Sequence, residues 1–184
     1  MAEKLKRKNI VVGVTGSIAI YKSCEVVRNL IKNNWSVKVV MTENAKKFVS
    51  PLTFETLSRN PVYSDMFEKK TYEEDHIALA DFASIILVCP ATANIIGKVS
   101  SGICDDLLTA TIFAFSGPVI FAPAMNENMW LNSIVQENVK KLKKHGYYFV
   151  EPEEGELASG KTGKGRLAKI EKIIDFVEKV YNKH

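Results

Sequence analysis

Residues 9–33 read NIVVGVTGSIAIYKSCEVVRNLIKN, and their order of apolar residues, glycine and polar residues indicates the fold class. The first six are an apolar, mostly β-branched run, which predicts a buried strand. A glycine turn follows at 15–18, and residues 17–33 then have the spacing of an amphipathic helix with Ser17 as its N-cap. A strand, a tight turn and a helix direct backbone N–H groups and the positive helix end at an anion, typically a phosphate. The full GxGxxG fingerprint is absent, and many α/β proteins use a glycine here only to turn.

The same alternation continues along the chain. Further strands are predicted at 36–41, 62–63, 84–89, 118–122 and 147–150, with helices between them and a closing helix at 168–181. Strands that alternate with helices form a parallel sheet with helices on both faces. We therefore expect residues 1–184 to form a single Rossmann-like α/β domain with about six strands. Residues 151–165 are charged and glycine-rich, and they predict a structureless mobile lid or ligand clamp.

Composition narrows the class of protein. The chain has 184 residues, 46% of them hydrophobic and 25% charged, with a net charge of +4. We expect no membrane span and no secretory signal, because apolar runs are short and the N-terminal MAEKLKRKN leads directly into a strand. Cys24, Cys89 and Cys104 lack CxxC spacing, which argues against a metal site or disulfide framework and favours a reducing cytoplasm. No aromatic residues interleave with the lysines, so nucleic acid is not an expected partner.

The most unusual connection follows the strand at 118–122, within residues 117–130, GPVIFAPAMNENMW. Loops are usually small and polar, but this one contains two methionines and a tryptophan beside Asn126. It is predicted at the carboxyl end of a strand, where ligands bind in open α/β sheets. An amide between soft, polarizable side chains suits an apolar ligand with one polar group to orient. The alternative is a surface loop plugged by Met125, Met129 and Trp130.

The segment PAMNENMW resembles the PxMNxxMW motif of the flavin-containing cysteine decarboxylases. Other segments extend the resemblance over nearly the whole chain. The turn at 15–18 resembles the family's phosphate loop, PATAN at 90–94 its PASANT motif, and GICDDLL at 102–108 a further family segment. Thr42, Ala45 and Phe48 match its T-x-x-A-x-x-F pattern, and His76 begins its histidine motif HI-x-LA. Without the resemblance, a lone histidine beside apolar residues is more often structural.

The resemblance implies FMN as cofactor and decarboxylation of 4'-phosphopantothenoylcysteine to 4'-phosphopantetheine, on the route to coenzyme A. A carboxylate leaves as carbon dioxide only if its electron pair has a sink, and a flavin creates one by oxidising the carbon that bears sulfur. Asn126 would hold the substrate carboxylate or amide, and His76 would assist thiol deprotonation or substrate placement. The implied FMN contacts are Gly16, Ser17, Ile18, Thr42, Phe48, Thr92, Ala93 and Asn94. The implied substrate contacts are Ala124, Met125, Asn126, Met129, Lys161, Lys164 and Arg166.

The clamp region is where the sequence departs from the family. Residues 158–166, ASGKTGKGR, resemble an ACGD-x-G-x-GR-like pattern of phosphopantothenoylcysteine decarboxylases, but Ser159 replaces the cysteine and Lys161 the aspartate. The resemblance therefore places Ser159 at the position of a catalytic thiol. The clamp cations suit a substrate phosphate, and a solvated basic turn explains them equally well.

The resemblance also implies partners and leaves rival functions. Members of the family form trimers, some assembled into dodecamers, with sites between subunits, and the phosphopantothenate–cysteine ligase can be a separate chain. One rival is an oxidative peptidyl-cysteine decarboxylase that stops at the enethiol, which the missing clamp cysteine favours. Another is a non-catalytic flavin-binding regulatory subunit, against which His76 and Asn126 argue. A flavin prenyltransferase shares the fold, but PAMNENMW argues against that assignment.

Overall fold

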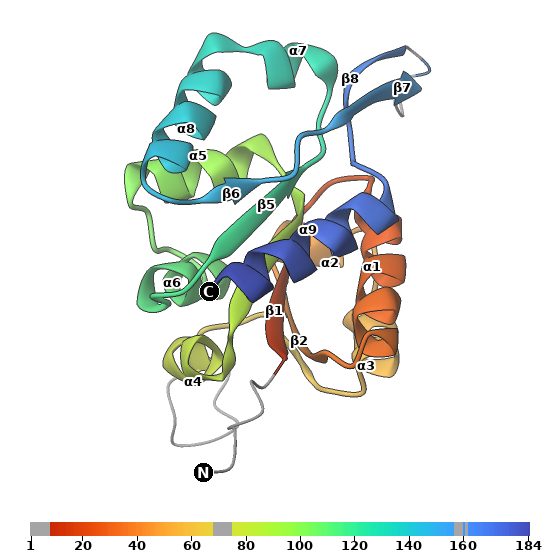
Figure 1. Cartoon of the computed structure of the whole chain (residues 1–184), viewed down its shortest axis with the longest axis vertical. Helices are drawn as coiled ribbons and strands as arrows, with labels where there is room; N and C mark the ends of the chain where they lie inside the picture. The colour runs from red at the N-terminus through yellow and green to blue at the C-terminus, as the bar shows by residue number, and fades with distance from the viewer. Residues whose placement is uncertain (1–7, 68–74, 157–159, 161) are drawn as a thin grey trace.

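The computed structural model describes residues 8–67, 75–156, 160 and 162–184. Its centre is a six-stranded, fully parallel sheet in the order β3-β2-β1-β4-β5-β6 (Figure 1). The strands β1, β4 and β5 are buried on both faces, which is why they appear in the sequence as continuous apolar runs. The predicted parallel sheet of about six strands is thus confirmed. The strands are β1 (Asn9–Val14), β2 (Ser36–Met41), β3 (Val62–Tyr63), β4 (Ile85–Ala91), β5 (Val119–Pro123) and β6 (Tyr148–Phe149).

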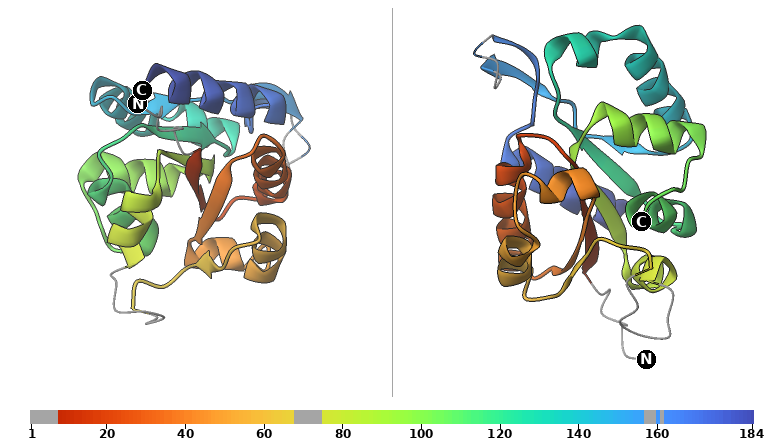
Figure 2. Two further views of the ribbon diagram at one scale, coloured as in Figure 1. Left: turned by 60° about the horizontal axis from the view of Figure 1, so that its bottom comes forward. Right: turned by 180° about the vertical axis from the view of Figure 1, so that it is seen from behind.

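Helices cover both faces of this sheet, as the sequence predicts (Figure 2). Successive strand residues point to opposite faces, so Val12 packs in the core beneath α1, α3 and α9, whereas Val11 packs in the core beneath α4, α5, α6 and α8. The helices are α1 (Ile20–Lys32), α2 (Glu43–Lys46), α3 (Pro51–Ser58), α4 (Asp75–Phe82), α5 (Ala93–Ser101), α6 (Leu107–Ala114), α7 (Glu127–Leu131), α8 (Ser133–Lys144) and α9 (Ile170–Lys183). None of them, within the described ranges, is long and apolar enough to cross a membrane.

The strand order positions the site. From β1 the chain builds outward to β2 and β3, and it then returns to place β4 on the other side of β1. The loops that leave β1 and β4 therefore diverge, and a crevice opens between them at the carboxyl ends of the strands. This crevice is where doubly wound α/β proteins bind their ligands.

The predicted N-cap at Ser17 is wrong. Helix α1 begins at Ile20 with Ala19 as its N-cap, and that cap makes no side-chain hydrogen bond. The Ser17 Oγ instead accepts from the Ala19 N–H at 3.3 Å, and the Ser17 carbonyl accepts from the Ile20 N–H at 3.0 Å. Ser17 thus stabilises a separate turn between β1 and α1, which leaves its side chain at the edge of the crevice.

The predicted structureless clamp is also wrong for the described residues. Strands β7 (Glu153–Glu156) and β8 (Thr162–Arg166) pair as an antiparallel ribbon, which extends beside α7 in Figure 1. Glycine and charged residues give this ribbon no alternating apolar pattern. It forms because its backbone is paired along its length and because it docks on the loop after β5.

Candidate functional site

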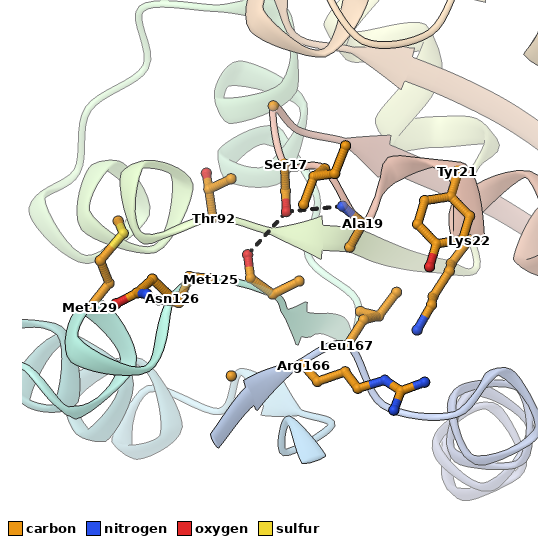
Figure 3. A pocket seen from close by; sticks show the side chains of 14 residues that line it. Ser17, Ala19, Tyr21, Lys22, Thr92, Met125, Asn126, Met129, Arg166 and Leu167 are labelled. Atoms are coloured by element: carbon orange, nitrogen blue, oxygen red, sulfur yellow. Dashed lines mark hydrogen bonds between the residues drawn. The ribbon is translucent and has the colours of Figure 1, made fainter. Parts of the chain in front are cut away.

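A cavity of about 610 Å³ lies at the carboxyl ends of β1, β4 and β5, and β8 closes one side of it (Figure 3). Four segments that are distant in the sequence form its wall. They are the turn after β1 with the first turn of α1, Thr92 after β4, the loop after β5, and the end of β8. The lining residues are Gly16, Ser17, Ile18, Ala19, Tyr21, Lys22, Thr92, Ala124, Met125, Asn126, Met129, Gly165, Arg166 and Leu167.

Hydrogen bonds fasten the turn after β1 to the neighbouring strand ends. The buried Thr15 hydroxyl donates to the Pro90 carbonyl at 2.7 Å and accepts from the Thr92 N–H at 3.2 Å. The Ser17 hydroxyl donates to the Ala124 carbonyl at 3.3 Å. The carboxyl ends of β1, β4 and β5 therefore hold one another in a fixed arrangement around the cavity. Thr15 is a positioning residue that sequence reasoning passed over.

Thr92 has two roles in the structure. It is the N-cap of α5, where its side-chain oxygen accepts from the Ile95 N–H at 3.4 Å, and it also lines the cavity. The capped strand–helix turn is thus present. The same short, polar side chain faces the cavity on the side where Ser17 and Asn126 lie (Figure 3).

The loop after β5 presents Asn126 in a fixed orientation. Asn126 is the N-cap of α7, and its Oδ1 accepts from the Asn128 N–H at 2.9 Å. Because the carbonyl side of this amide is committed to α7, the NH₂ group is the part left for a ligand, and no described residue accepts a hydrogen bond from it. Met125 and Met129 flank it, and Trp130, at 2% exposure, belongs to the core. The alternative of a loop packed on the core is therefore true of Trp130 and in part of Met125, which packs against the same core, but not of Met129, which is 48% exposed.

The ribbon docks directly on this loop. The Met125 N–H donates to the Gly165 carbonyl at 3.0 Å, and the Lys164 N–H donates to Glu127 Oε1 at 2.9 Å. Gly165 has a φ of +145°, and a Cβ there would lie 2.3 Å from the Met125 carbonyl oxygen. Only glycine allows so close a contact, so the glycine at this position of β8 is required by the docking itself.

Two cations lie at the end of the pocket opposite Asn126 and Met129 (Figure 3). Lys22 is on the first turn of α1 and Arg166 is the last residue of β8. Burial, and then the nearby Arg166 guanidinium, lower the pKa of Lys22, while Glu153 and Glu25 act in the opposite direction. The pocket thus has an amide at one end and a positive field at the other, with apolar side chains and the Ser17 and Thr92 hydroxyls between them.

The structure brings together most of the residues that the sequence proposed for the site. Gly16, Ser17, Ile18, Thr92, Ala124, Met125, Asn126, Met129 and Arg166 all line the cavity. Ser159 and Lys161 lie outside the described residues. The residues predicted for the site but absent from the cavity wall are His76, Thr42, Phe48, Ala93, Asn94 and Lys164.

The six residues that do not line the cavity lie in different parts of the molecule. Thr42 and Asn94 follow β2 and β4 at the same edge of the sheet, so they lie beyond the cavity rim rather than at the other end of the molecule. Phe48 is half exposed. His76 is on α4, which packs on α6 and lies at the lower end of Figure 1, whereas α7 and β8 lie at the upper end.

Sequence reasoning missed Ala19, Tyr21, Lys22, Gly165 and Leu167 as lining residues. Lys22 had no local signal, because Ile18 lies outside α1, which begins at Ile20. Tyr21 and Leu167 had none, since only the docking of the ribbon against α1 and the loop after β5 makes them neighbours of the cavity.

In the part of the chain that the structure describes, no three His, Cys, Asp or Glu side chains are grouped to hold an ion. The acidic pair at 105 and 106 instead contacts Lys98, with Nζ–O distances of 2.7 and 2.8 Å.

Known proteins share this architecture. The Flavoprotein family matches residues 1–182. The coenzyme A biosynthesis bifunctional protein CoaBC of Bacillus subtilis (strain 168) is 48% identical over 176 residues, which are 95% of this chain and 43% of that protein. The probable phosphopantothenoylcysteine decarboxylase of Streptococcus mutans serotype c is 41% identical over 174 residues, 93% of this chain and 97% of that protein. The crystal structure of the FMN-dependent cysteine decarboxylase SpaF aligns with a TM-score of 0.82 and 30% identity over 95% of each chain.

These matches differ in length. The chain spans less than half of the bifunctional B. subtilis protein but nearly all of the S. mutans protein. A family match over residues 1–182, together with this sheet order and the cavity at its switch point, shows that the chain belongs to the flavoprotein family.

Proposed function

We propose that this protein decarboxylates 4'-phosphopantothenoylcysteine to 4'-phosphopantetheine with bound FMN, as a carboxy-lyase of coenzyme A biosynthesis. The observation that carries the proposal is the pocket itself, with the oriented Asn126 amide at one end and two cations at the other. The substrate has matching ends, a carboxylate and a phosphate, joined by a largely neutral chain. The names of the B. subtilis and S. mutans relatives support this choice.

The residues present fit FMN. The turn at Gly16, Ser17 and Ile18 precedes the N-terminus of α1, which favours an anion. The Ile18 N–H, in particular, has no acceptor among the described residues. Small side chains at Ala19 and Ala124 leave a smooth wall for a flat ring, and the cavity has the size of a small-molecule site. When bound, FMN would supply the hydride acceptor and donor of the reaction.

We infer that Thr42, Phe48, Ala93 and Asn94 contact the cofactor outside the cavity wall. Thr42 is the N-cap of α2 and Asn94 lies in the first turn of α5, and both follow strands at the carboxyl edge of the sheet, next to the turn after β1. A cofactor that extends from the turn after β1 toward α2 or α5 would reach them. This is the reason to keep them in the proposed FMN site although the cavity stops short of them.

The chain's own side chains would orient and shield the substrate. The Asn126 NH₂ group donates to the carboxylate that is lost, and Met125 and Met129 supply apolar contacts beside it. The ribbon covers the loop after β5 through its contacts with Met125 and Glu127, so it excludes water from that end of the pocket. Lys164 is exposed on the ribbon and would add positive charge near the phosphate.

We further propose that the protein acts as a homo-oligomer, a trimer or a dodecamer, in which His76 of one copy serves the pocket of another. Within one chain α4 and the pocket are at different ends of the molecule. Large apolar side chains around the pocket mouth are also exposed: Ile18 by 56%, Tyr21 by 59% and Met129 by 48%. Exposed apolar groups gathered at one site mark interaction surfaces.

We also propose a cellular compartment and a partner enzyme for the protein. Its cysteines, Cys24, Cys89 and Cys104, are all free, which suits a reducing cytoplasm. The larger size of the bifunctional relative supports a phosphopantothenate–cysteine ligase as partner, on a separate chain or in a longer form of this one.

A second candidate function is oxidative decarboxylation that stops at the enethiol. The presence of Ser159 at the position of the clamp cysteine favours it, and SpaF is named a cysteine decarboxylase. Mass spectrometry of the products formed from phosphopantothenoylcysteine tests both. We expect loss of carbon dioxide in either case, whereas binding without any such loss would instead identify a regulatory flavin-binding subunit.

A further inference from the structure

Lys22 and Arg166 come from segments far apart in the chain and meet at one end of the pocket. Both line the cavity, and Figure 3 shows their charged groups on the side away from Asn126 and Met129. After burial, Arg166 is the main influence that lowers the pKa of Lys22, as expected for two cations held near one another. Bringing like charges together costs free energy, so the arrangement needs an explanation.

No described carboxylate neutralises this pair. Within the described residues, neither Lys22 nor Arg166 forms an ion pair. The acidic groups that act on Lys22 are Glu153 and Glu25. Glu153 is already engaged, since its Oε1 lies 3.7 Å from Lys172 Nζ. An anion entering this end of the pocket would therefore meet two cations that form no ion pair among the described residues, although Lys22 Nζ lies 5.9 Å from the centre of the Tyr21 ring.

We propose that Lys22 and Arg166 together form the subsite for the phosphate monoester of the substrate, an inference that rests on the proposed function. A phosphate monoester carries up to two negative charges and several acceptor oxygens, so it suits one ammonium and one guanidinium from different directions. Arg166 follows Gly165 on the strand that docks beside Asn126. The subsite and the carboxylate contact thus belong to one continuous groove, and its length selects substrates with anions at both ends.

FMN also carries a phosphate monoester, so Lys22 and Arg166 could in principle bind the phosphate of the cofactor or that of the substrate. The turn at Ser17 and Ile18 offers the cofactor backbone N–H groups and the N-terminus of α1. Arg166 reaches the pocket only through the ribbon, which covers the loop of Asn126 where the substrate reacts. We therefore assign the pair to the substrate.

The test compares phosphopantothenoylcysteine with pantothenoylcysteine, which lacks only the phosphate. We expect Lys22→Met in the FMN-loaded protein to lower kcat/KM for the phosphorylated substrate by about tenfold to a hundredfold, the range for a lost charged hydrogen bond. Turnover of pantothenoylcysteine should fall far less, because this substrate has no phosphate for the pair to bind. Lys22→Arg should retain most of the preference. Lys32→Met is the matched control, because Lys32 is exposed at the far end of the same helix and both substrates should be unaffected.

A binding measurement without turnover gives a second readout. Calorimetric titration should show that Lys22→Met weakens binding of 4'-phosphopantetheine but not of pantetheine. Equal losses for both ligands, or none, would overturn the subsite. The substrate subsite would also be overturned if Lys22→Met apoprotein bound FMN more weakly than wild type but bound riboflavin equally well. That result would assign the pair to the phosphate of the cofactor. If the wild type turns over neither substrate but still binds 4'-phosphopantetheine through Lys22, the proposed function fails while the subsite stands.

Discussion

The Glu127 carboxylate accepts a hydrogen bond from the Lys164 backbone N–H at 2.9 Å, and so links α7 to β8. One residue before Asn126, the Met125 N–H donates to the Gly165 carbonyl at 3.0 Å. The ribbon is therefore held on both sides of Asn126. These two hydrogen bonds fix the end of β8, which contains Gly165 and Arg166, against the loop that contains Asn126. They therefore set the position of the ribbon and that of the proposed catalytic amide together.

Removing the Glu127 carboxylate should loosen the ribbon without disturbing the sheet. We expect Glu127→Ala to speed hydrogen exchange at the Lys164 N–H and to raise KM more than it lowers kcat, because the ribbon orients substrate but carries no described reacting group. Amide exchange followed by mass spectrometry measures the first effect. Glu137→Ala, at an exposed position of α8, is the control. Unchanged exchange across β8 in Glu127→Ala would show that the carboxylate does not hold the ribbon.

Glycine at 165 should be irreplaceable, whereas glycine at 97 should not. We expect Gly165→Ala to detach the ribbon, because its Cβ would meet the Met125 carbonyl at 2.3 Å and its φ is +145°. Gly97 lies inside α5, where a Cβ would meet only Asn138 Nδ2 at 4.0 Å. Gly97→Ala should therefore raise the free energy of unfolding by about 0.5–1 kcal/mol. Chemical denaturation measures the stability of Gly97→Ala, and the rate of proteolysis within the ribbon measures its detachment in Gly165→Ala. A Gly165→Ala protein with an intact ribbon and full activity would refute the docking argument.

Complementation between two inactive variants tests the shared site. His76→Asn and Asn126→Asp should each lose most turnover and keep bound FMN, since an aspartate at position 126 would place a negative charge beside the substrate carboxylate. Coexpressed, the two variants should regain part of the activity, because some pockets then combine an intact His76 with an intact Asn126. Analytical ultracentrifugation should show a trimer or larger species. A coexpressed mixture as inactive as its parts would place both residues in one chain's site or remove one from the mechanism.

Acid should weaken the start of α6 through Asp106. Burial tends to raise its pKa, but hydrogen bonds from Lys98 and Thr109 outweigh burial, and the net pKa is lowered from 3.8. A carboxyl with a lowered folded-state pKa stabilises the fold above its unfolded pKa, and that stability is lost as pH falls through the folded value. Asp106→Asn should thus be less stable than wild type near neutral pH, and the difference should shrink below about pH 4. Urea unfolding at several pH values measures it, with Asp81→Asn, at an exposed position of α4, as control. A difference independent of pH would rule out the carboxylate charge as its source.

The sheet could be predicted well from the sequence because its central strands β1, β4 and β5 are buried on both faces. Such strands consist of unbroken runs of apolar residues. Prediction from the sequence failed for segments whose local residue pattern is weak and whose structure depends on tertiary contacts. The ribbon 153–166 contains few apolar residues and depends on Glu127 and Met125, which precede it by more than two dozen positions. Helix α7 has five residues, too few for a helical period to be recognised. Lys22 was overlooked because its role depends on Arg166, which only the folded chain brings near it.

The final prediction concerns Ser159, whose role rests on sequence because it lies outside the described residues. A thiol has a pKa of about 8.5, so it can give a proton to a developing carbanion, whereas a serine hydroxyl needs a neighbouring base or relay. We expect wild-type protein to release some oxidised enethiol beside 4'-phosphopantetheine, with Lys161 as the substitute proton donor. Ser159→Cys should shift the product toward the reduced thiol.

A thiol introduced elsewhere should have no such effect. Ser36→Cys is the control, because Ser36 is exposed at the amino end of β2, at the edge of the sheet away from the pocket. Product masses measured in single-turnover reactions distinguish the two products. If wild-type protein forms only the reduced thiol, the clamp cysteine is dispensable here and another acid supplies the proton. Lys161→Met should then convert that product to the enethiol, and a variant that still forms the reduced thiol would eliminate Lys161 as the donor.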